Sequence, residues 1–115
     1  MMTLIRVVVF KDVDWWIIYG LDYEFVTLVR SLEEVPGEIR RWLSVLFAAC
    51  QHLGVEPFHD YAPAPKKYWR LYEQAEPWME LLGDLGSGPI VETRLSAEPP
   101  RRLSPAGASG ISPAA

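Results

Sequence analysis

The sequence predicts an α+β fold: a three-stranded antiparallel meander packed on one long helix, followed by a proline-rich loop, a second helix and a disordered C-terminal tail (β-β-β-α-α). Two observations predict it. Three short runs rich in β-branched and aromatic residues, joined by polar turns, lie within residues 3–30. The hydrophobic period then changes to that of an amphipathic helix over residues 39–53. With 115 residues, 50% of them hydrophobic, the chain can form one domain with a real core.

The three predicted strands are residues 3–11, 15–21 and 24–30. The first, "TLIRVVVFK", is β-branched and mostly apolar, which is typical of a strand with both faces at least partly covered. The other two, "WWIIYGL" and "EFVTLVR", follow the polar stretches "DVD" and "DY". Because tight polar turns favour hairpins, we expect successive strands to pair antiparallel.

The first predicted helix has a single apolar stripe. Its members recur at helical spacing: Ile39, Trp42, Leu43, Leu46, Phe47, Cys50 and Leu53. The stretch "SLEE" (31–34) matches a capping box, but Pro36 would remove a backbone hydrogen bond inside a helix that began there. We therefore expect a first turn at residues 32–35, the regular helix from Pro36, and its end at Gly54.

Proline-rich sequence follows. We expect "VEPFHDYAPAP" (55–65) to lie extended over the surface and "KKYWRLYEQA" (66–75) to form the second helix. Pro77 breaks or kinks that helix, and "PWMELLG" restarts a turn or two before Gly83. The predicted domain is therefore residues 1–83. The tail, 84–115, is rich in proline, serine and glycine, has no aromatic residue and is predicted to be disordered, with "PIVETRL" (89–95) as the one stretch compatible with a short edge strand.

The two adjacent tryptophans of the middle strand cannot share one core, because neighbouring strand residues point to opposite faces. We assign Trp16 and Ile18 to the helix side, since Gly20 on the same face allows another backbone to come close. Phe25 and Val29 of the third strand are expected to join them. The opposite face then carries an apolar set: Trp15, Ile17, Tyr19, Val26 and Leu28.

Two alternatives remain for what covers that opposite face. The second helix folds across it, with Trp69, Tyr72 and Trp78 completing an ordinary core, or part of the face stays uncovered as a binding or dimer surface. We expect a mixture, in which the helix covers one side and a homodimer or a protein partner covers the remainder. The predicted partner-binding residues are Trp15, Ile17, Tyr19 and Leu28 as apolar contacts, with Lys66, Lys67 and Arg70 as charged neighbours.

The titratable residues form no catalytic or metal-binding pattern, so we expect no enzyme, cofactor or metal. Asp12 and Asp14 flank one predicted turn and Asp22 and Glu24 the next, at opposite ends of the sheet, roughly 20 Å apart. They fit turn-forming and solubilising roles. Neither histidine has a partner that is evident in the sequence, and the single cysteine lies on the apolar stripe.

Composition narrows the classes of partner. A count of 11 basic against 15 acidic residues gives a net charge of −4, which argues against broad binding of phosphate backbones. No small-molecule site is evident, and no apolar stretch is long enough to span a membrane. No charged-then-apolar leader opens the sequence. The simplest interpretation is a cytoplasmic protein.

The order of these features resembles the HicB-like family of small antitoxin-type domains. The resemblance is carried by "VVVFKDVDWWIIYGLDYEFVTLVRSLEEV", with its hairpin, "GL-[DE]" turn, third strand and "[ST]-x-E-E" helix start. The continuation "GVEPFHDYAPAPKKYWRLYEQA" is similar to a tail of stand-alone members, and the two stretches cover about residues 4–76. The resemblance implies a truncated ribonuclease H-like fold that lacks the acidic metal cluster.

In function, the resemblance implies a protein-binding module that neutralises a HicA-type ribonuclease toxin or a diverged target. Family members usually bind operator DNA through a C-terminal helix-turn-helix or ribbon-helix-helix segment. Residues 84–115 fit neither motif, so DNA binding is not expected for this chain. Two other hypotheses stay open: a small nucleic-acid-binding protein that uses the aromatic sheet face, and a stand-alone structural homodimer.

Overall fold

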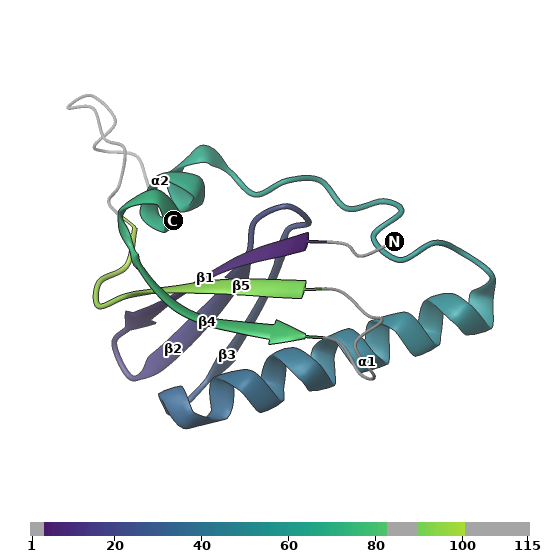
Figure 1. Ribbon diagram of the computed structural model, residues 1–115, viewed down its shortest axis with the longest axis horizontal. Helices are drawn as coiled ribbons and strands as arrows, with labels where there is room; N and C mark the ends of the chain where they lie inside the picture. The colour runs from purple at the N-terminus through teal and green to yellow at the C-terminus, as the bar shows by residue number, and fades with distance from the viewer. Residues whose placement is uncertain (1–3, 83–89, 101–115) are drawn as a thin grey trace.

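The computed structural model describes residues 4–82 and 90–100 and has an α+β fold (Figure 1). Its elements run in the order β-β-β-α-α-β-β, with a short 3-10 turn before the first helix. They are the strands β1 (Leu4–Asp12), β2 (Trp15–Gly20) and β3 (Phe25–Val29), the turn η1 (Leu32–Glu34), the helices α1 (Val35–Leu53) and α2 (Lys66–Gln74), and the strands β4 (Glu76–Leu82) and β5 (Ile90–Ser96).

The five strands form one mixed sheet in the order β3-β2-β1-β5-β4. The predicted meander of β1, β2 and β3 is present, with both hairpins antiparallel. β5 lies beside β1 and runs parallel to it, and β4 pairs antiparallel with β5 at the far edge. β1 is therefore the central strand, which agrees with its apolar sequence, because its side chains from Val7 to Phe10 are buried on both faces.

The C-terminal part corrects two predictions. The stretch after Pro77 was expected to restart a helix, but it belongs to strand β4. The stretch 89–95 was expected at most at an edge, but β5 lies inside the sheet, where Val91 and Thr93 are buried. The predicted domain end at residue 83 therefore falls between two strands of one sheet. The physical reason is the parallel pairing of β5 with β1, which joins segments far apart in the sequence and leaves no local pattern. The tail positions 84–89 and 101–115 lie outside the described residues.

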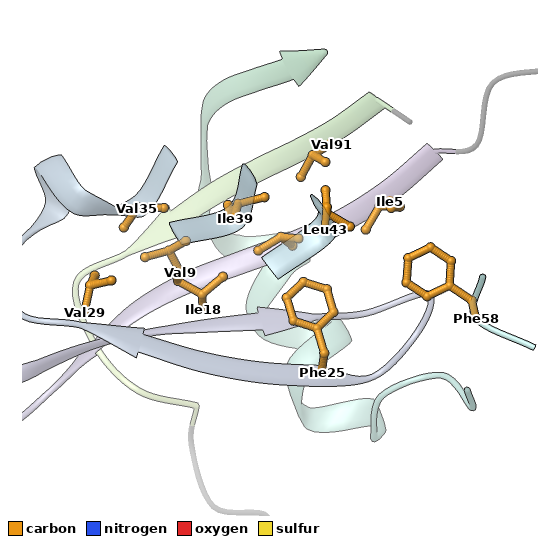
Figure 2. Packing of buried hydrophobic residues seen from close by; sticks show 11 residues of the cluster. Ile5, Val9, Ile18, Phe25, Val29, Val35, Ile39, Leu43, Phe58 and Val91 are labelled. Atoms are coloured by element: carbon orange, nitrogen blue, oxygen red, sulfur yellow. The ribbon is translucent and has the colours of Figure 1, made fainter. Parts of the chain in front are cut away.

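One face of the sheet packs on α1 (Figure 2). The side chains of Ile39 and Leu43 on the helix point toward Val9 and Ile18 on the sheet. The main core is this cluster of buried residues: Ile5, Val7, Val9, Ile18, Phe25, Val29, Val35, Ile39, Leu43, Phe58 and Val91. Trp16 packs against the same cluster, so the predicted division of the middle strand between two faces is confirmed.

Gly20 is needed on this face, as expected, although the neighbour that comes close is mainly a side chain. The ring of Phe25, its cross-strand partner, lies where a Cβ of residue 20 would be, and the carbonyl oxygen of Tyr23 lies close to that position. An aromatic ring packed over a strand glycine fills the space that the missing side chain leaves.

The ends of α1 lie near their predicted positions. The 3-10 turn precedes the helix, which begins at Val35 with Pro36 in its first turn. The capping-box match at residues 31–34 does not form a capping box, because the Ser31 side chain makes no cap hydrogen bond. The carboxylate of Glu34 instead accepts a hydrogen bond from the backbone N–H of Arg30, at 3.0 Å. Gly54 ends the helix in the left-handed conformation, with φ of 74°.

The second helix lies on the opposite face of the sheet from α1 (Figure 1). A smaller core lies between this helix, β1 and the end of β2, and its buried members are Val8, Phe10, Tyr19, Leu21, Ala64 and Tyr72. Trp78, which was expected in this core, packs instead against the α1-side cluster, because it belongs to β4 rather than to a continued helix. In the residues that the structure describes, no helix is long and apolar enough to cross a membrane.

Candidate protein-binding surface

The second helix is held over β1 and β5 by a set of polar and aromatic contacts. The ring of the buried Tyr72 lies under the Arg94 guanidinium, 4.3 Å from it, and Arg94 Nη1 donates to the Tyr72 carbonyl oxygen at 3.0 Å. The Tyr72 hydroxyl donates to Glu92 at 3.3 Å. Burial and the nearby Glu92 carboxylate raise the pKa of Tyr72. These contacts place α2 over the β5 half of the sheet and leave the other half to be covered by other groups.

An ion pair ties the β2–β3 turn to β1 beside this helix. The carboxylate of Asp22 accepts a hydrogen bond from the backbone N–H of Arg6 at 2.8 Å. It also accepts two hydrogen bonds from the Arg6 guanidinium, from Nε at 3.2 Å and from Nη2 at 2.9 Å. Its hydrogen bond to Asp22 raises the pKa of Arg6. The same guanidinium lies 5.1 Å from the ring centroid of Trp69 on α2. Asp22 is therefore a structural turn residue, which agrees with the role expected for it.

The helix contacts β2 where Tyr68 stacks on Tyr19. Their ring centroids are 3.6 Å apart and their planes are 14° from parallel. The Tyr19 hydroxyl donates to the carboxylate of Glu24. Burial, followed by this hydrogen bond, raises the pKa of Tyr19. Tyr19 is only 8% exposed, so this predicted contact residue lies beneath Tyr68 and is not accessible to a partner.

Beyond this stack the apolar side chains on the outer side of β2 and β3 are only partly covered; of those on β2, Ile17 packs against the α2-side core. We call the four apolar residues there the open face: Trp15, Ile17, Val26 and Leu28. Val26 is 49% exposed and Leu28 43%, while the two β2 residues are half-buried. Leu28 lies directly opposite Ile17 in the strand register. The expected mixture of covered and uncovered apolar surface is thus what the described residues show.

Arg30 extends the open face at the end of β3. Its guanidinium lies 4.2 Å from the centroid of the Trp15 ring, a distance typical of a cation–π contact. Arg30 was not among the site residues predicted from the sequence. The alternation of strand side chains could have found it, because residue 30 falls on the same face as Val26 and Leu28.

The three predicted charged neighbours are all exposed on α2, but only one is placed at the open face. Lys67 Nζ lies 5.1 Å from the centroid of the Tyr68 ring, whose other contact is Tyr19. Lys67 therefore borders the open face. No contact among the described residues brings Lys66 or Arg70 to it.

Other exposed apolar residues lie on α1 and just after it. Leu53, predicted on the apolar stripe, is 71% exposed at the end of the helix, and Val45 in its middle and Val55 beyond it are also exposed. The helix continues past the edge of the sheet in Figure 1, so its last turn has no strand beneath it. Aromatic residues around Phe58, in the loop after the helix, cover part of this end, and Phe47 packs edge-on to Phe58.

In residues 4–82 and 90–100 no three histidine, cysteine, aspartate or glutamate side chains gather as metal ligands. His59 lies 3.5 Å from Asp60, and both side chains are exposed. Cys50 is buried on α1 as a free thiol. The fold is thus an α+β domain that carries an apolar surface at one edge of its sheet. No family model matches the sequence, and no curated protein or solved structure matches the chain.

Proposed function

We propose that this chain is a non-enzymatic protein-binding module of the HicB-like kind, which binds its partner through the open face. The observation that carries the proposal is the exposure of Val26 and Leu28, two large apolar side chains on one side of an edge strand. The rest of the same sheet face is covered by α2. Soluble antiparallel sheets with a solvated face normally place polar residues there.

The energetics favour a protein as the partner. Full burial of one valine or leucine side chain stabilises by about 1.5–3 kcal/mol. Val26 and Leu28 are about half exposed, so a partner that covers both gains about 2 kcal/mol from these two residues. Trp15 and Arg30 add the residue types that most often dominate protein interfaces. Their stacking fixes the Arg30 side chain before a partner arrives, which lowers the entropy cost of binding.

The family resemblance supports a specific partner. The meander followed by a helix is the order that the resemblance to HicB-type antitoxins implies. A HicA-type ribonuclease toxin, or a diverged relative of one, is accordingly the proposed target, and the chain acts by covering it. The strands β4 and β5 were not part of the expected fold, and the proposal assigns them no contact with the target.

Nucleic-acid binding is a second candidate, favoured by one observation. Arg30 on Trp15 and Lys67 on Tyr68 each place a positive charge on an aromatic ring at the outer sheet face. Aromatic and cationic side chains together can hold single-stranded bases. The net charge of −4 argues against this candidate. Salt separates the two, because binding driven by phosphate contacts weakens steeply as salt rises, whereas an apolar protein interface responds little.

The test is calorimetric titration of the chain with a HicA-type ribonuclease, at low and high salt. Leu28→Lys places a charge on the open face and is expected to weaken binding at least tenfold. Val45→Lys, at an exposed apolar residue of α1 away from the open face, is the control and should bind like the unchanged chain. Equal affinity of Leu28→Lys and Val45→Lys, or no binding by the unchanged chain, would contradict the proposal.

A further inference from the structure

The hairpin of β1 and β2 ends in a tight turn that extends past the neighbouring strands. The last pair of its ladder is Asp12 with Trp15, so Val13 and Asp14 form the turn. β5 ends its pairing with β1 two residues before Asp12, and β3 pairs with β2 only from the residue after Trp15. Among the described residues, no strand therefore lies beside the end of the hairpin. The side chains of Asp12, Val13 and Asp14 are all exposed.

Val13 is the strained residue of this turn. A two-residue hairpin turn needs a positive φ at its first central residue, where glycine, asparagine or aspartate is usual. Val13 has φ of 58°, which is an outlier for a β-branched side chain. Its side chain is 80% exposed, more than any other large apolar residue that the structure describes. Packing within the described part of the chain therefore does not offset the strain.

Two tryptophans hold the base of the turn. Trp15 lies on the outer face of the sheet, with the Arg30 guanidinium 4.2 Å from its ring centroid. Trp16 lies on the α1 face, with Lys11 Nζ 5.7 Å from its ring centroid, and both rings are half-buried. A side chain presented on a preorganised turn loses little entropy when a partner binds. Because Trp15 belongs to the open face, the turn continues that surface at the end of the hairpin.

We infer that Val13 is a contact residue for the protein partner and inserts into an apolar socket on it. The inference rests on the proposed function, because it extends the open face to the end of the hairpin. Strained backbone conformations cluster at positions that contact ligands. Covering an exposed valine stabilises a complex, whereas asparagine at this position would stabilise only the free chain.

The charges of the turn indicate what surrounds the socket. Asp12 and Asp14 lie one on each side of Val13, and no ion pair among the described residues involves either carboxylate. Two nearby cations, Lys11 and Arg30, lie over the tryptophan rings on opposite faces of the sheet, so the turn itself carries only negative charge. A socket with lysine or arginine at its rim complements this charge. Proteins that bind RNA use such cations to contact phosphates, so the RNA-binding surface of a ribonuclease fits the description.

Calorimetric titration with a HicA-type ribonuclease tests the contact. Val13→Asn tolerates the positive φ, so it should be more stable to urea than the unchanged chain, while its affinity falls about tenfold. Val13→Ile keeps an apolar β-branched side chain and should bind more tightly than Val13→Asn. Val45→Asn, on the exposed side of α1, is the control and should bind like the unchanged chain. Unchanged affinity of Val13→Asn, or lower stability of this variant, would overturn the inference.

Leu28→Lys in the same titration separates this inference from the proposed function. A loss of affinity in Leu28→Lys with none in Val13→Asn would leave the open face as the binding surface and would overturn only the role of Val13. No binding by the unchanged chain would overturn both.

The charge of the turn is tested by Asp12→Asn combined with Asp14→Asn. Asparagine is compatible with the turn and removes both negative charges. The double variant should bind about threefold more weakly at low salt, and the difference should vanish at high salt, because exposed ion pairs are weak and screened. Equal affinity of the double variant and the unchanged chain at low salt would overturn the cationic rim of the socket.

Discussion

The rings of Tyr19 and Tyr68 stack with their centroids 3.6 Å apart, and this contact divides the outer face of the sheet in two. On one side of it, α2 covers β1 and β5 through Tyr72 and Trp69. On the other side, Val26 and Leu28 are exposed. The position of the stack therefore determines which apolar residues complete the core and which remain exposed.

Removal of the Tyr68 ring should loosen α2 and expose Tyr19. We expect Tyr68→Ala to lower the free energy of unfolding by about 2 kcal/mol, less than for a fully buried aromatic residue because Tyr68 is only half-buried. Urea denaturation followed by circular dichroism measures the change. Lys67→Ala, on the exposed neighbour, should stay within about 0.5 kcal/mol of the unchanged chain. Equal stability of the two variants would show that the stack does not hold the helix.

Alkaline pH should destabilise the fold through its buried tyrosines. Burial raises the pKa of Tyr19 and of Tyr72 in the folded chain, whereas tyrosines of the unfolded chain ionise near their ordinary pKa of about 10. The unfolded state therefore releases protons first, and the free energy of unfolding should fall as the pH rises above about 10. Urea midpoints at increasing pH check this. In Tyr19→Phe the free energy of unfolding should decline less steeply with pH. The same decline as in the unchanged chain would show that ionisation of Tyr19 does not contribute to the loss of stability.

Acid should weaken the contact between α1 and β3. Glu38 accepts hydrogen bonds from Arg41 at 2.7 Å and from Thr27 at 2.5 Å, and these bonds lower its pKa. Because the pKa of Glu38 is lower in the folded than in the unfolded chain, its ionised carboxylate stabilises the fold above about pH 4.3, the ordinary pKa of a glutamate in the unfolded chain. This stabilisation is lost as the pH falls through the lowered pKa of the folded chain. Glu38→Gln should reduce the loss of stability below about pH 4.3. Glu33→Gln, on the exposed turn before the helix, serves as the control. Parallel acid profiles for Glu38→Gln and the unchanged chain would show that this contact does not contribute.

The β1–β2 turn stores backbone strain at Val13. This residue has φ of 58°, a left-handed conformation that is costly for a β-branched side chain, and it is 80% exposed. Asparagine adopts that conformation readily in turns. Val13→Asn should therefore raise the free energy of unfolding by about 1 kcal/mol. Val45→Asn, at an exposed position of α1, should give no such gain. A less stable Val13→Asn variant would mean that the valine side chain makes a contact that offsets the strain.

The sequence was informative wherever a local pattern decided the structure. Side-chain alternation placed Trp16 and Ile18 against α1 and Tyr19 on the other side, as the structure has them. Helical spacing and Gly54 located α1. These predictions depend only on the geometry of one element, which its own residues determine.

Predictions failed where the structure depends on segments far apart in the chain. β5 joins the sheet through its parallel pairing with β1, and β4 is a strand because β5 is beside it. Once β4 replaced the expected helical turns, Trp78 moved to the other core. In the candidate site, the stack of Tyr68 on Tyr19 removed one predicted contact, and the contact of Arg30 with Trp15 added a residue. Both changes arise from the packing of one element on another.

Backbone amide mapping by NMR on addition of the proposed partner, a HicA-type ribonuclease, tests the central claim most directly. If the uncovered side of β2 and β3 is the binding surface, the largest shifts should occur at Ile17, Val26 and Leu28. Exposed residues of α1, such as Val45 in its middle and Leu53 at its end, should remain unchanged. Shifts confined to α1, with β3 unaffected, would contradict the account.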